Sequence, residues 1–566
     1  ASGNAGSDNL YVEDVFSTYL YDGQATSLAI DNGLDLDGKG GLTWIKARTD
    51  AASHSLFDTE RTLSTRLISN STNAEQLLSG AFTSFNSNGF TLAGNTGSLN
   101  DPLHSFASWS FRKAEKFFDI QTWTGTGASS RTIAHSLGSV PAFMIVKGTN
   151  ASGWLTYHTS LGATQYVQLQ STAAAATYPI WDDTTPTDSV FSIGSYGDLN
   201  ENGVTYVAYL FASDAGGFGE DGTENIIKCG SYTGNGSTNG PEIDCGFEPQ
   251  WVLVKRSDAV GNWILMDVMR GMATDGDTAG LLPATSGAEF STPLLDVNAT
   301  GFQPRITDDR TNEPGGNYIY IAIRRPMKTP TEGTEVLSTV AYTGTGADKF
   351  LTSSSVVDLA FNKRRTSGDW TWTGRLQGAA RKLVSNGDFS EGTDPDGIKG
   401  LDYNNGVLLG ENDDVNGNGD TYISYMLSRA TGAFDVVAYT GDGASLSHNL
   451  GVVPEFIITK ARGANGSWRV TSSATTGVLY IDANDAKNGT DSFQTLTPCT
   501  ATTMNLSGIS QNTTNISYLF ATVAGVSKVG SYTGTGSNVD VDCGFSAGAR
   551  FVLIKRTDSA GNWFIY

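Results

Sequence analysis

The chain has 566 residues, a length that accommodates about three to six domains of ordinary size. Its 36 Lys plus Arg against 58 Asp plus Glu give a formal charge of −22, so it lacks the basic face that nucleic-acid binding requires. The 67 glycines and 39% hydrophobic residues are typical of a folded protein rich in tight turns, and they argue against collagen and intrinsic disorder. No apolar run approaches the ~18 residues of a transmembrane helix, so we expect no membrane insertion.

A phrase of the form aromatic-Thr-Gly-x-Gly recurs along the chain. Its copies lie at residues 122–127, 231–236, 341–346, 438–443 and 531–536. The spacings of 109, 110, 97 and 93 residues separate the aromatic markers Trp123, Tyr232, Tyr342, Tyr439 and Tyr532. Self-similarity at this period predicts a tandem array of small domains.

Downstream of the phrase, an apolar run ends in Lys, and a short polar link then leads to Trp. These lysines are Lys147, Lys255, Lys363, Lys460 and Lys555, and the matching tryptophans are Trp154, Trp263, Trp370, Trp468 and Trp563. The copy with Lys363 and Trp370 is weaker, and so is one near the N-terminus that has Lys46, with His54 in the Trp place. Runs of β-branched and aromatic residues joined by Gly, Asn and Ser predict a β-hairpin in each copy.

A further strand pattern closes each copy, with apolar residues on both faces, as in a strand at the centre of a sheet. These segments are 105–111, 205–211, 317–323, 421–427 and 516–520. We therefore predict an all-β tandem array of β-sandwich or jelly-roll repeats, each of about 100 residues. The predicted repeats 1 to 6 are 1–116, 117–226, 227–334, 335–433, 434–526 and a truncated 527–566.

The repeats also follow a longer cycle. Residues 118–120 and 135–141 of repeat 2 match 434–436 and 448–454 of repeat 5, and residues 243–247 of repeat 3 match 541–545 of repeat 6. This order predicts a superperiod of about 300 residues. Repeat 6 ends soon after Trp563 whereas repeat 3 continues well beyond Trp263, so we expect the chain to be a segment of something longer.

One acidic cluster bears on catalysis. Strand periodicity would send Glu242, Asp244 and Glu248 to one side, and paired carboxylates are the machinery of glycosidases. Repeat 6 has Ser546 in the place of Glu248, however. We favour a solvated acidic edge and predict no catalytic residue.

Two loops share the D-x-N-x-N-G start of a calcium site. Their oxygen-bearing residues are Asp198, Asn200, Asn202, Asp414, Asn416, Asn418 and Asp420. The position of the bidentate Glu is occupied by Tyr209 or Tyr425, so we favour an Asx-rich turn, with a structural calcium ion as the alternative cofactor.

The recurring tryptophans, Trp154, Trp263, Trp370, Trp468 and Trp563, fit two roles. They are core anchors or, as a speculative alternative, stacking platforms for a saccharide ligand. The recurring lysines are expected at a sheet edge, where charge discourages aggregation. We expect His135 and His448 to be hydrogen-bonded in turns, and Cys229 and Cys245 to be buried free thiols.

Several of these stretches resemble repeated domains of unknown function in virion proteins of marine bacteriophages. The resemblance lies in residues 44–46, 53–61, 67–72, 83–90, 448–460 and 532–536, with a weaker echo of Asp58-x-x-Arg61 at Asp267-x-x-Arg270. Such domains look similar to concanavalin A-like lectin sandwiches. The resemblance implies a phage tail fibre, spike or capsid appendage and transfers no catalytic residue.

Our first hypothesis is therefore a non-enzymatic protein on the virion surface that presents repeated sandwiches for attachment to host-surface glycans or proteins. Repeated weak sites would gain avidity through effective concentration. The expected partners are other virion proteins and further copies of the chain, with a trimer as the form common among phage fibres. The alternatives are a purely structural surface-layer or adhesin subunit without ligand binding, and a polysaccharide depolymerase.

Overall fold

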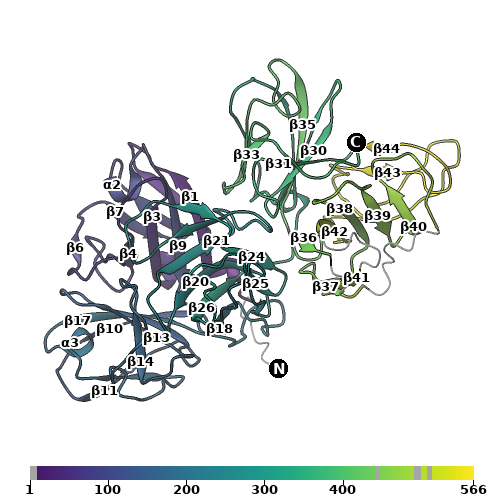
Figure 1. Ribbon diagram of the computed structural model, residues 1–566. Coiled ribbons are helices and arrows are strands. Elements are labelled where there is room, and N and C mark those ends of the chain that lie inside the picture. The colour runs from purple at the N-terminus through teal and green to yellow at the C-terminus, as the bar shows by residue number, and fades with distance from the viewer. Residues whose placement is uncertain (1–8, 442–444, 490–498, 506–512) are drawn as a thin grey trace, which may run out of the picture. The chain divides into compact units, whose positions relative to one another are not determined.

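The computed structural model describes residues 9–441, 445–489, 499–505 and 513–566. It is built almost wholly of short antiparallel strands, which confirms the all-β prediction (Figure 1). Its three α-helices have four residues each: α1 (Leu36–Lys39), α2 (Gly97–Asn100) and α3 (Gly197–Asn200). Two 3-10 turns, η1 (Val12–Asp14) and η2 (Gly333–Glu335), precede the first strands of repeats 1 and 4. Within the described residues, no helix is both long and apolar enough to cross a membrane.

Repeat 1 is a two-layer sandwich. Its larger sheet has the order β1 (Phe16–Asp22), β9 (Ser105–Arg112), β3 (Gly41–Ala47), β4 (Ser55–Asp58). The second sheet is β2 (Leu28–Asp31), β8 (Gly89–Leu92), β7 (Phe82–Asn86), and β5 (Thr65–Arg66) pairs with β6 (Gln76–Leu77). Ile45, Phe57 and Phe106 of the first sheet pack against Phe82 and Phe90 of the second, which forms the core.

Repeats 2 and 3 extend the larger sheet to six strands. In repeat 2 it is β10 (Phe118–Thr124), β17 (Thr205–Phe211), β12 (Phe143–Gly148), β13 (Trp154–His158), β14 (Gln165–Gln168), β15 (Ala176–Thr177), with β11 (Ser130–Ala134) and β16 (Val190–Gly194) opposite. In repeat 3 it is β18 (Ile227–Thr233), β26 (Asn317–Arg324), β20 (Pro249–Arg256), β21 (Trp263–Asp267), β22 (Thr278–Leu281), β23 (Phe290–Thr292), with β19 (Ile243–Asp244), β25 (Gly301–Pro304) and β24 (Leu295–Asn298).

Repeats 4 and 5 keep this strand order. Repeat 4 has β27 (Leu337–Thr343), β35 (Thr421–Leu427), β29 (Leu359–Arg364), β30 (Trp370–Gly374), β31 (Arg381–Val384), β32 (Gly392–Thr393), with β28 (Lys349–Thr352), β34 (Gly406–Leu409) and β33 (Ile398–Gly400). Repeat 5 has β36 (Phe434–Thr440), β42 (Thr514–Phe520), β38 (Phe456–Ala461), β39 (Arg469–Ser472), β40 (Thr475–Tyr480), with β37 (Ser445–Ser447) and β41 (Thr503–Asn505). Repeat 6 contributes the hairpin β43 (Leu553–Lys555) and β44 (Trp563–Ile565).

The strand pairing explains the sequence patterns. The closing strand lies between the first strand and the Lys-bearing strand, as its two apolar faces predicted, and Lys147 lies opposite Trp154 in the hairpin. In the glycine phrase, a Cβ on Gly125 would lie 2.1 Å from the carbonyl oxygen of Glu201, and Gly127 has a φ of 70°. Only glycine tolerates both conditions. The copy at 438–443 ends outside the described residues.

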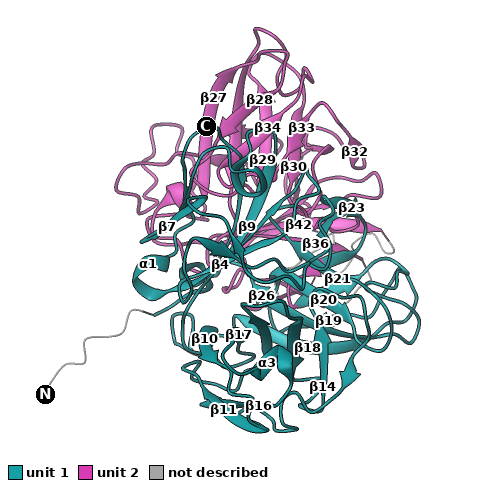
Figure 2. Ribbon diagram, turned by 90° about the vertical axis from the view of Figure 1, so that its left-hand side faces the viewer, with its two compact units in different colours: residues 1–270, 278–296, 301–327 teal, residues 271–277, 297–300, 328–566 magenta. Residues whose placement is uncertain are grey.

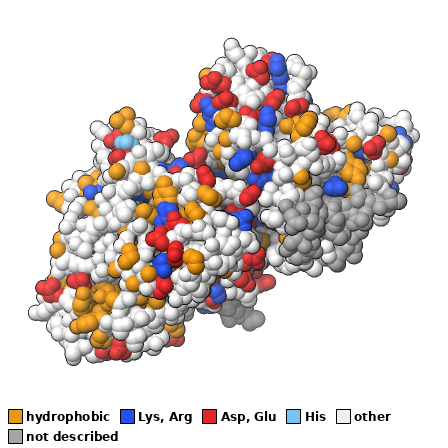
Figure 3. All heavy atoms as spheres, in the orientation of Figure 1, with side chains coloured by type: hydrophobic (Ala, Val, Ile, Leu, Met, Phe, Trp, Pro, Cys, Tyr) orange, Lys and Arg blue, Asp and Glu red, His pale blue; other side chains and the backbone are white. Residues whose placement is uncertain are grey.

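The chain divides into two compact units (Figure 2). Unit 1 comprises residues 1–270, 278–296 and 301–327, and unit 2 comprises residues 271–277, 297–300 and 328–566. Repeats 1 to 3 thus lie essentially in unit 1 and repeats 4 to 6 in unit 2. Acidic side chains are scattered over the visible face of the molecule rather than gathered in one place (Figure 3), as expected for charge spread over many loops.

Candidate functional site

The recurring tryptophans lie at junctions between repeats. Trp154, Trp263 and Trp468 are at most 1% exposed. Each indole N–H donates to a main-chain carbonyl of the preceding repeat: Trp154 to Ile68 (2.8 Å), Trp263 to Gln168 (2.9 Å), Trp468 to Val384 (2.8 Å) and the half-buried Trp563 to Tyr480 (2.7 Å). A ring with no exposed face offers no stacking surface, so burial favours the core-anchor alternative for the first three.

Trp370 is the exception. It is half-buried, packs against Phe361 and Tyr425, and has the amine of Lys363 6.0 Å from its ring centroid. It belongs to repeat 4, the first repeat of unit 2.

Most of the recurring lysines are also interior, so the edge prediction was wrong for them. Lys363 and Lys555 are half-buried, and Lys555 lies on the two-stranded sheet of β43 and β44. Lys46, Lys147, Lys255 and Lys460 have no exposed surface, and their strands lie inside the sheets. The Lys147 amine donates to the carbonyls of Gly148 and Asn150, both at 2.9 Å, and to the Ser152 hydroxyl at 3.1 Å. Burial lowers the pKa of each of these four amines to about 8. The lysine thus satisfies the carbonyls of its own hairpin link.

A main-chain hydrogen bond recurs at five junctions. In each case a loop residue of one repeat donates its main-chain N–H to a carbonyl of another repeat. The acceptor is the residue two positions after the recurring lysine. The pairs are Glu75 to Thr149 (3.0 Å), Ala175 to Ser257 (2.8 Å), Glu289 to Arg48 (2.8 Å), Glu391 to Arg462 (2.8 Å) and Lys487 to Thr557 (3.1 Å). The third pair runs from repeat 3 back to repeat 1, so the three repeats of unit 1 form a closed cycle.

A second contact closes the same cycle. Equivalent positions of repeats 1, 2 and 3 are occupied by Asp58, His158 and Asp267. In its hairpin, each of them pairs with the residue four positions before the buried lysine. Asp58 accepts from the hydroxyl of Tyr209 (2.7 Å), His158 Nε2 pairs with the carbonyl of Tyr320 (3.0 Å), and Asp267 accepts from the indole of Trp109 (3.0 Å). Each donor or acceptor partner lies on the closing strand of another repeat.

Electrostatics at these contacts follow from burial. Burial, and then the charge of Asp58, raises the pKa of Tyr209 well above its usual value, so the phenol remains a donor. Burial lowers the pKa of His158 to about 4. The neutral ring accepts from Ser160 N–H at Nδ1 (3.1 Å), which leaves Nε2 as the donor to Tyr320.

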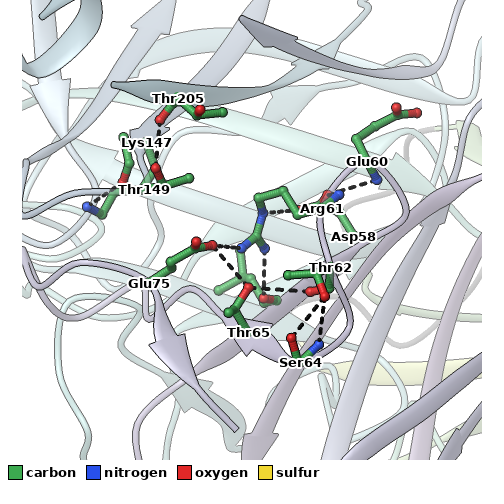
Figure 4. A network of polar contacts seen from close by, with 12 residues as sticks. Asp58, Glu60, Arg61, Thr62, Ser64, Thr65, Glu75, Lys147, Thr149 and Thr205 are labelled. Atoms are coloured by element: carbon green, nitrogen blue, oxygen red, sulfur yellow. Dashed lines mark hydrogen bonds and ion pairs between the residues drawn. The ribbon is translucent and has the colours of Figure 1, made fainter. Parts of the chain in front are cut away.

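Junction 1–2, the contact between repeats 1 and 2, is built around a guanidinium group (Figure 4). Arg61 lies between Asp58 (2.8 Å) and Glu75 (3.3 Å), and its own side chain is 5% exposed. The Thr65 hydroxyl also donates to Glu75 (3.0 Å), and Glu75 reaches repeat 2 through its main-chain N–H. Asp58 and Arg61 of the Asp-x-x-Arg motif thus form an ion pair, and its weaker echo, Asp267 and Arg270, forms the equivalent pair in repeat 3.

Junction 3–1 repeats this arrangement with a second arginine. Arg270 contacts Asp267 (2.6 Å) and Glu289 (3.1 Å), and Arg48 of repeat 1 contacts Glu289 (2.8 Å). The Arg270 guanidinium also lies 5.3 Å from the ring centroid of Trp109. Burial would raise the pKa of Glu289, but Arg270 and Arg48 together hold it below its ordinary value.

At junction 4–5 in unit 2, the cation comes from repeat 5, across the junction from the glutamate. Gly374 and Gln377 stand in the places of Asp58 and Arg61, and Arg462 of repeat 5 pairs with both oxygens of Glu391 at 2.7 and 3.0 Å. The Gln377 amide donates to Glu391 (3.1 Å) and accepts from the hydroxyl of Tyr518 (3.4 Å).

Aromatic side chains from different repeats meet within each unit. In unit 1, Phe111 of repeat 1 lies 5.4 Å from Phe211 of repeat 2 and 5.9 Å from Trp251 of repeat 3, measured between ring centroids, with edge-on geometry. In unit 2, Phe551 of repeat 6 lies 5.2 Å from Tyr425 of repeat 4. Edge-on aromatic contacts add stabilisation beyond burial.

The two loops with a calcium-like start hold Asx anchors. The Asn200 side chain is fully buried, accepts from the N–H of Thr126 (2.9 Å) and donates to the carbonyl of Ala128 (2.9 Å). Asn416 makes the same bonds to Thr345 and Ala347. The buried residues Asn100 and Asn312 do so in repeats 1 and 3 without the full motif, and sequence reasoning missed them.

The remaining oxygens of these loops point elsewhere. Asp198 accepts from the N–H of Gly153 (3.1 Å), Asp414 pairs with Lys382 (3.1 Å) and Asp420 with Arg364 (2.6 Å), while Asn202 and Asn418 are exposed. These partners favour the Asx-turn interpretation. Among the described residues, no cluster of three or more His, Cys, Asp or Glu side chains could hold a metal ion.

The acidic cluster of repeat 3 does not share one face, so that expectation was wrong. Glu242 and Asp244 are exposed, whereas Glu248 is buried, 3.5 Å from Arg325. Gly246, with a φ of 76°, breaks the strand alternation between them. The geometry of paired glycosidase carboxylates is therefore missing from this cluster.

The histidine and cysteine predictions are confirmed. The ring nitrogens of His135 lie 3.2 Å from the carbonyl of Thr187 and 3.3 Å from the N–H of Leu137, and His448 receives the N–H of Leu450 at 3.3 Å. Cys229 and Cys245 are buried and free. Burial raises the pKa of the Cys245 thiol to about 12, so it is not an activated nucleophile.

The architecture is a tandem array of β-sandwiches in which the recurring residues hold neighbouring sandwiches together. A family model described as "Domain of unknown function (DUF7483)" matches residues 12–326 and residues 332–566. The chain therefore belongs to the DUF7483 family and contains two tandem copies of its domain. The copies start 332 − 12 = 320 residues apart, which agrees with the predicted superperiod. No curated protein matches the chain.

Proposed function

We propose that the chain is a non-enzymatic structural protein of a bacteriophage virion, a tail fibre, spike or capsid appendage that presents β-sandwich repeats at the particle surface. The single observation that supports this role is the use of the recurring residues. The buried Trp154 indole, the amines of Lys255 and Lys460, and the N–H of the loop Glu all bond to main-chain carbonyls of a neighbouring repeat. Recurring residues that make contacts between repeats are what a rigid structural assembly requires.

Host attachment through surface glycans is part of the proposal. The fully buried Trp154, Trp263 and Trp468 cannot serve it, so the contacts would come from other side chains. A purely structural subunit of a surface layer or an adhesin is the second candidate, and the interior position of Trp154, Trp263 and Trp468 favours it. A polysaccharide depolymerase is the weakest alternative, because Glu248 is buried against Arg325.

Immunogold labelling tests the virion role. Antibodies against the chain would be applied to purified particles of the phage that encodes it, with particles of an unrelated phage as the control. We expect gold at one defined place on the particle surface. Labelling confined to cell envelopes, with bare particles, would instead assign the chain to a surface layer or adhesin.

A further inference from the structure

Three tyrosines meet on the surface of repeat 2. Tyr166 is on β14, Tyr178 follows β15 directly, and Tyr196 lies between β16 and α3. The ring centroids of Tyr178 and Tyr196 are 5.3 Å apart at 58°, and Tyr166 lies near enough to contribute, after burial, to raising the pKa of Tyr196. Tyr178 is 50% exposed and the other two are half-buried. Figure 3 shows hydrophobic side chains gathered over the part of the molecule where Figure 1 places β10, β17 and α3.

The backbone under this cluster is fixed. Ile180 and Trp181, which follow Tyr178, are buried, and the Trp181 indole donates to the carbonyl of Gln165 (3.2 Å). Tyr196 immediately precedes α3, where the N–H groups of Leu199 and Asn200 both donate to its carbonyl at 2.9 Å. The backbone that carries Tyr178 and Tyr196 is therefore held in place before any ligand arrives, which reduces the entropy lost on binding.

The repeat framework does not account for these tyrosines. Strand pairing and loop hydrogen bonds place Gly280, Thr292 and Asp308 at the corresponding positions of repeat 3. In repeat 4 the positions are Lys382, Asp394 and Asn412, which form a polar cluster with Lys382–Asp394 at 3.2 Å and Asn412–Asp394 at 2.8 Å. Only repeat 2 of these three has aromatic residues there. An exposed aromatic cluster that packing does not require marks a binding surface.

The chemistry of the surface points to the ligand. Tyrosine rings offer flat apolar faces, and their hydroxyls hydrogen-bond at the rim, which suits the C–H face and hydroxyls of a sugar. Repeat 2 carries 2 Lys plus Arg against 10 Asp plus Glu, a formal charge of 2 − 10 = −8. An anionic ligand would be repelled by this charge.

We propose that Tyr166, Tyr178 and Tyr196 form a stacking site for a neutral saccharide. This inference rests on the proposed function, because it names the ligand class and the residues through which such an appendage would hold a host-surface glycan. It moves the binding role from the recurring tryptophans to a cluster that occurs once among repeats 2 to 4.

Affinity electrophoresis of the full chain tests the site. Native gels would contain dextran, mannan or galactan as neutral probes, or alginate as an anionic probe. The test variant is Tyr178→Ala/Tyr196→Ala. The matched control is Phe389→Ala, which removes an aromatic side chain that is 60% exposed in repeat 4.

We expect at least one neutral polysaccharide to retard the wild-type chain and the Phe389→Ala variant equally. The double Tyr variant should bind that polysaccharide about tenfold or more weakly, with an unchanged melting temperature because both rings are at the surface. The site is refuted if no neutral probe retards the chain, if the double variant is retarded like the wild type, or if alginate binds through the same tyrosines. Particle labelling is independent of this result, so the two proposals fail separately.

Discussion

Junctions 1–2 and 4–5 each pair a loop glutamate with a cation, but the cation comes from opposite sides of the junction. Both place a glutamate, Glu75 or Glu391, on the loop whose N–H bonds to the next repeat. In junction 1–2 its cation is Arg61 of the same repeat, and Thr149 stands across the junction. In junction 4–5 the same-repeat position is Gln377, and the cation is Arg462 across the junction.

Junctions 3–1 and 2–3 extend the series. Junction 3–1 has Glu289 with arginines on both sides, whereas junction 2–3 has Ala175 in the acid position and Leu161 and Ser257 in the two cation positions. A glutamate thus occurs only where an arginine faces it. A half-buried carboxylate without a cation lowers stability. The junction therefore requires the glutamate–arginine pair, and either of the two repeats can supply the arginine.

Removal of the most enclosed cation should have the largest effect. Arg270→Ala leaves Asp267 uncompensated at a site with no side-chain exposure, and we expect unit 1 to lose about 4 kcal/mol of unfolding free energy. Calorimetry of the full chain would measure it. Arg556→Ala is the control, because that arginine is 63% exposed, and its effect should be negligible. Equal effects of the two variants would contradict the role of junction 3–1.

Acid should weaken junction 2–3 before junction 3–1. The folded pKa of His158 is about 4 against an ordinary 6.5, so the unfolded chain takes up the proton first as pH falls. Stability from this residue is complete above pH 6.5 and is lost between pH 6.5 and 4, by roughly 3 kcal/mol.

Glu289, whose pKa is held below the ordinary 4.5, keeps its contribution above that pH and loses it below. Melting temperatures from pH 7 to 3 would separate the two steps. In His158→Gln, which retains a donor for the Tyr320 carbonyl, the loss between pH 6.5 and 4 should shrink. An unchanged profile would show that His158 does not titrate in this way.

The buried lysines should contribute less than the junction arginines. Lys147→Met leaves the carbonyls of Gly148 and Asn150 without their donor, and we expect a loss of about 2 kcal/mol, partly offset because a charge is no longer buried. The control is Lys39→Met at an exposed position. Chemical denaturation of both variants provides the measurement, and equal midpoints would show that the Lys147 hydrogen bonds do not stabilise the hairpin link.

The smallest predicted effect is a gain in the stability of unit 2. Asn362 in repeat 4 is fully buried, and neither polar atom of its side chain has a hydrogen-bond partner among the described residues. Ile45, Val146 and Val254 occupy its place in repeats 1 to 3. Asn362→Val should therefore stabilise unit 2 by about 1 kcal/mol and raise its melting temperature. A lower melting temperature would indicate that internal water satisfies the asparagine.

The local fold could be predicted from the sequence because its signals are local. Alternation, glycine phrases and Lys-to-Trp spacing identify the hairpins and central strands. The junctions could not be predicted, because the Trp154 indole and the Glu75 N–H bind main-chain carbonyls that leave no mark on the sequence. The sequence displays Asp267-x-x-Arg270 but not its burial, and Tyr166, Tyr178 and Tyr196 meet only through the strand pairing.

An exchange of the cation across junction 4–5 tests the central claim most directly. Arg462→Thr reproduces the residue of junction 1–2 at that place and should cost about 3 kcal/mol, because Glu391 loses its cation. Adding Gln377→Arg supplies the cation from the other side, and we expect it to recover most of the lost melting temperature of unit 2. The single variant Gln377→Arg is the matched control. If the double variant melts no higher than Arg462→Thr alone, the repeats are not joined by an interchangeable charge pair.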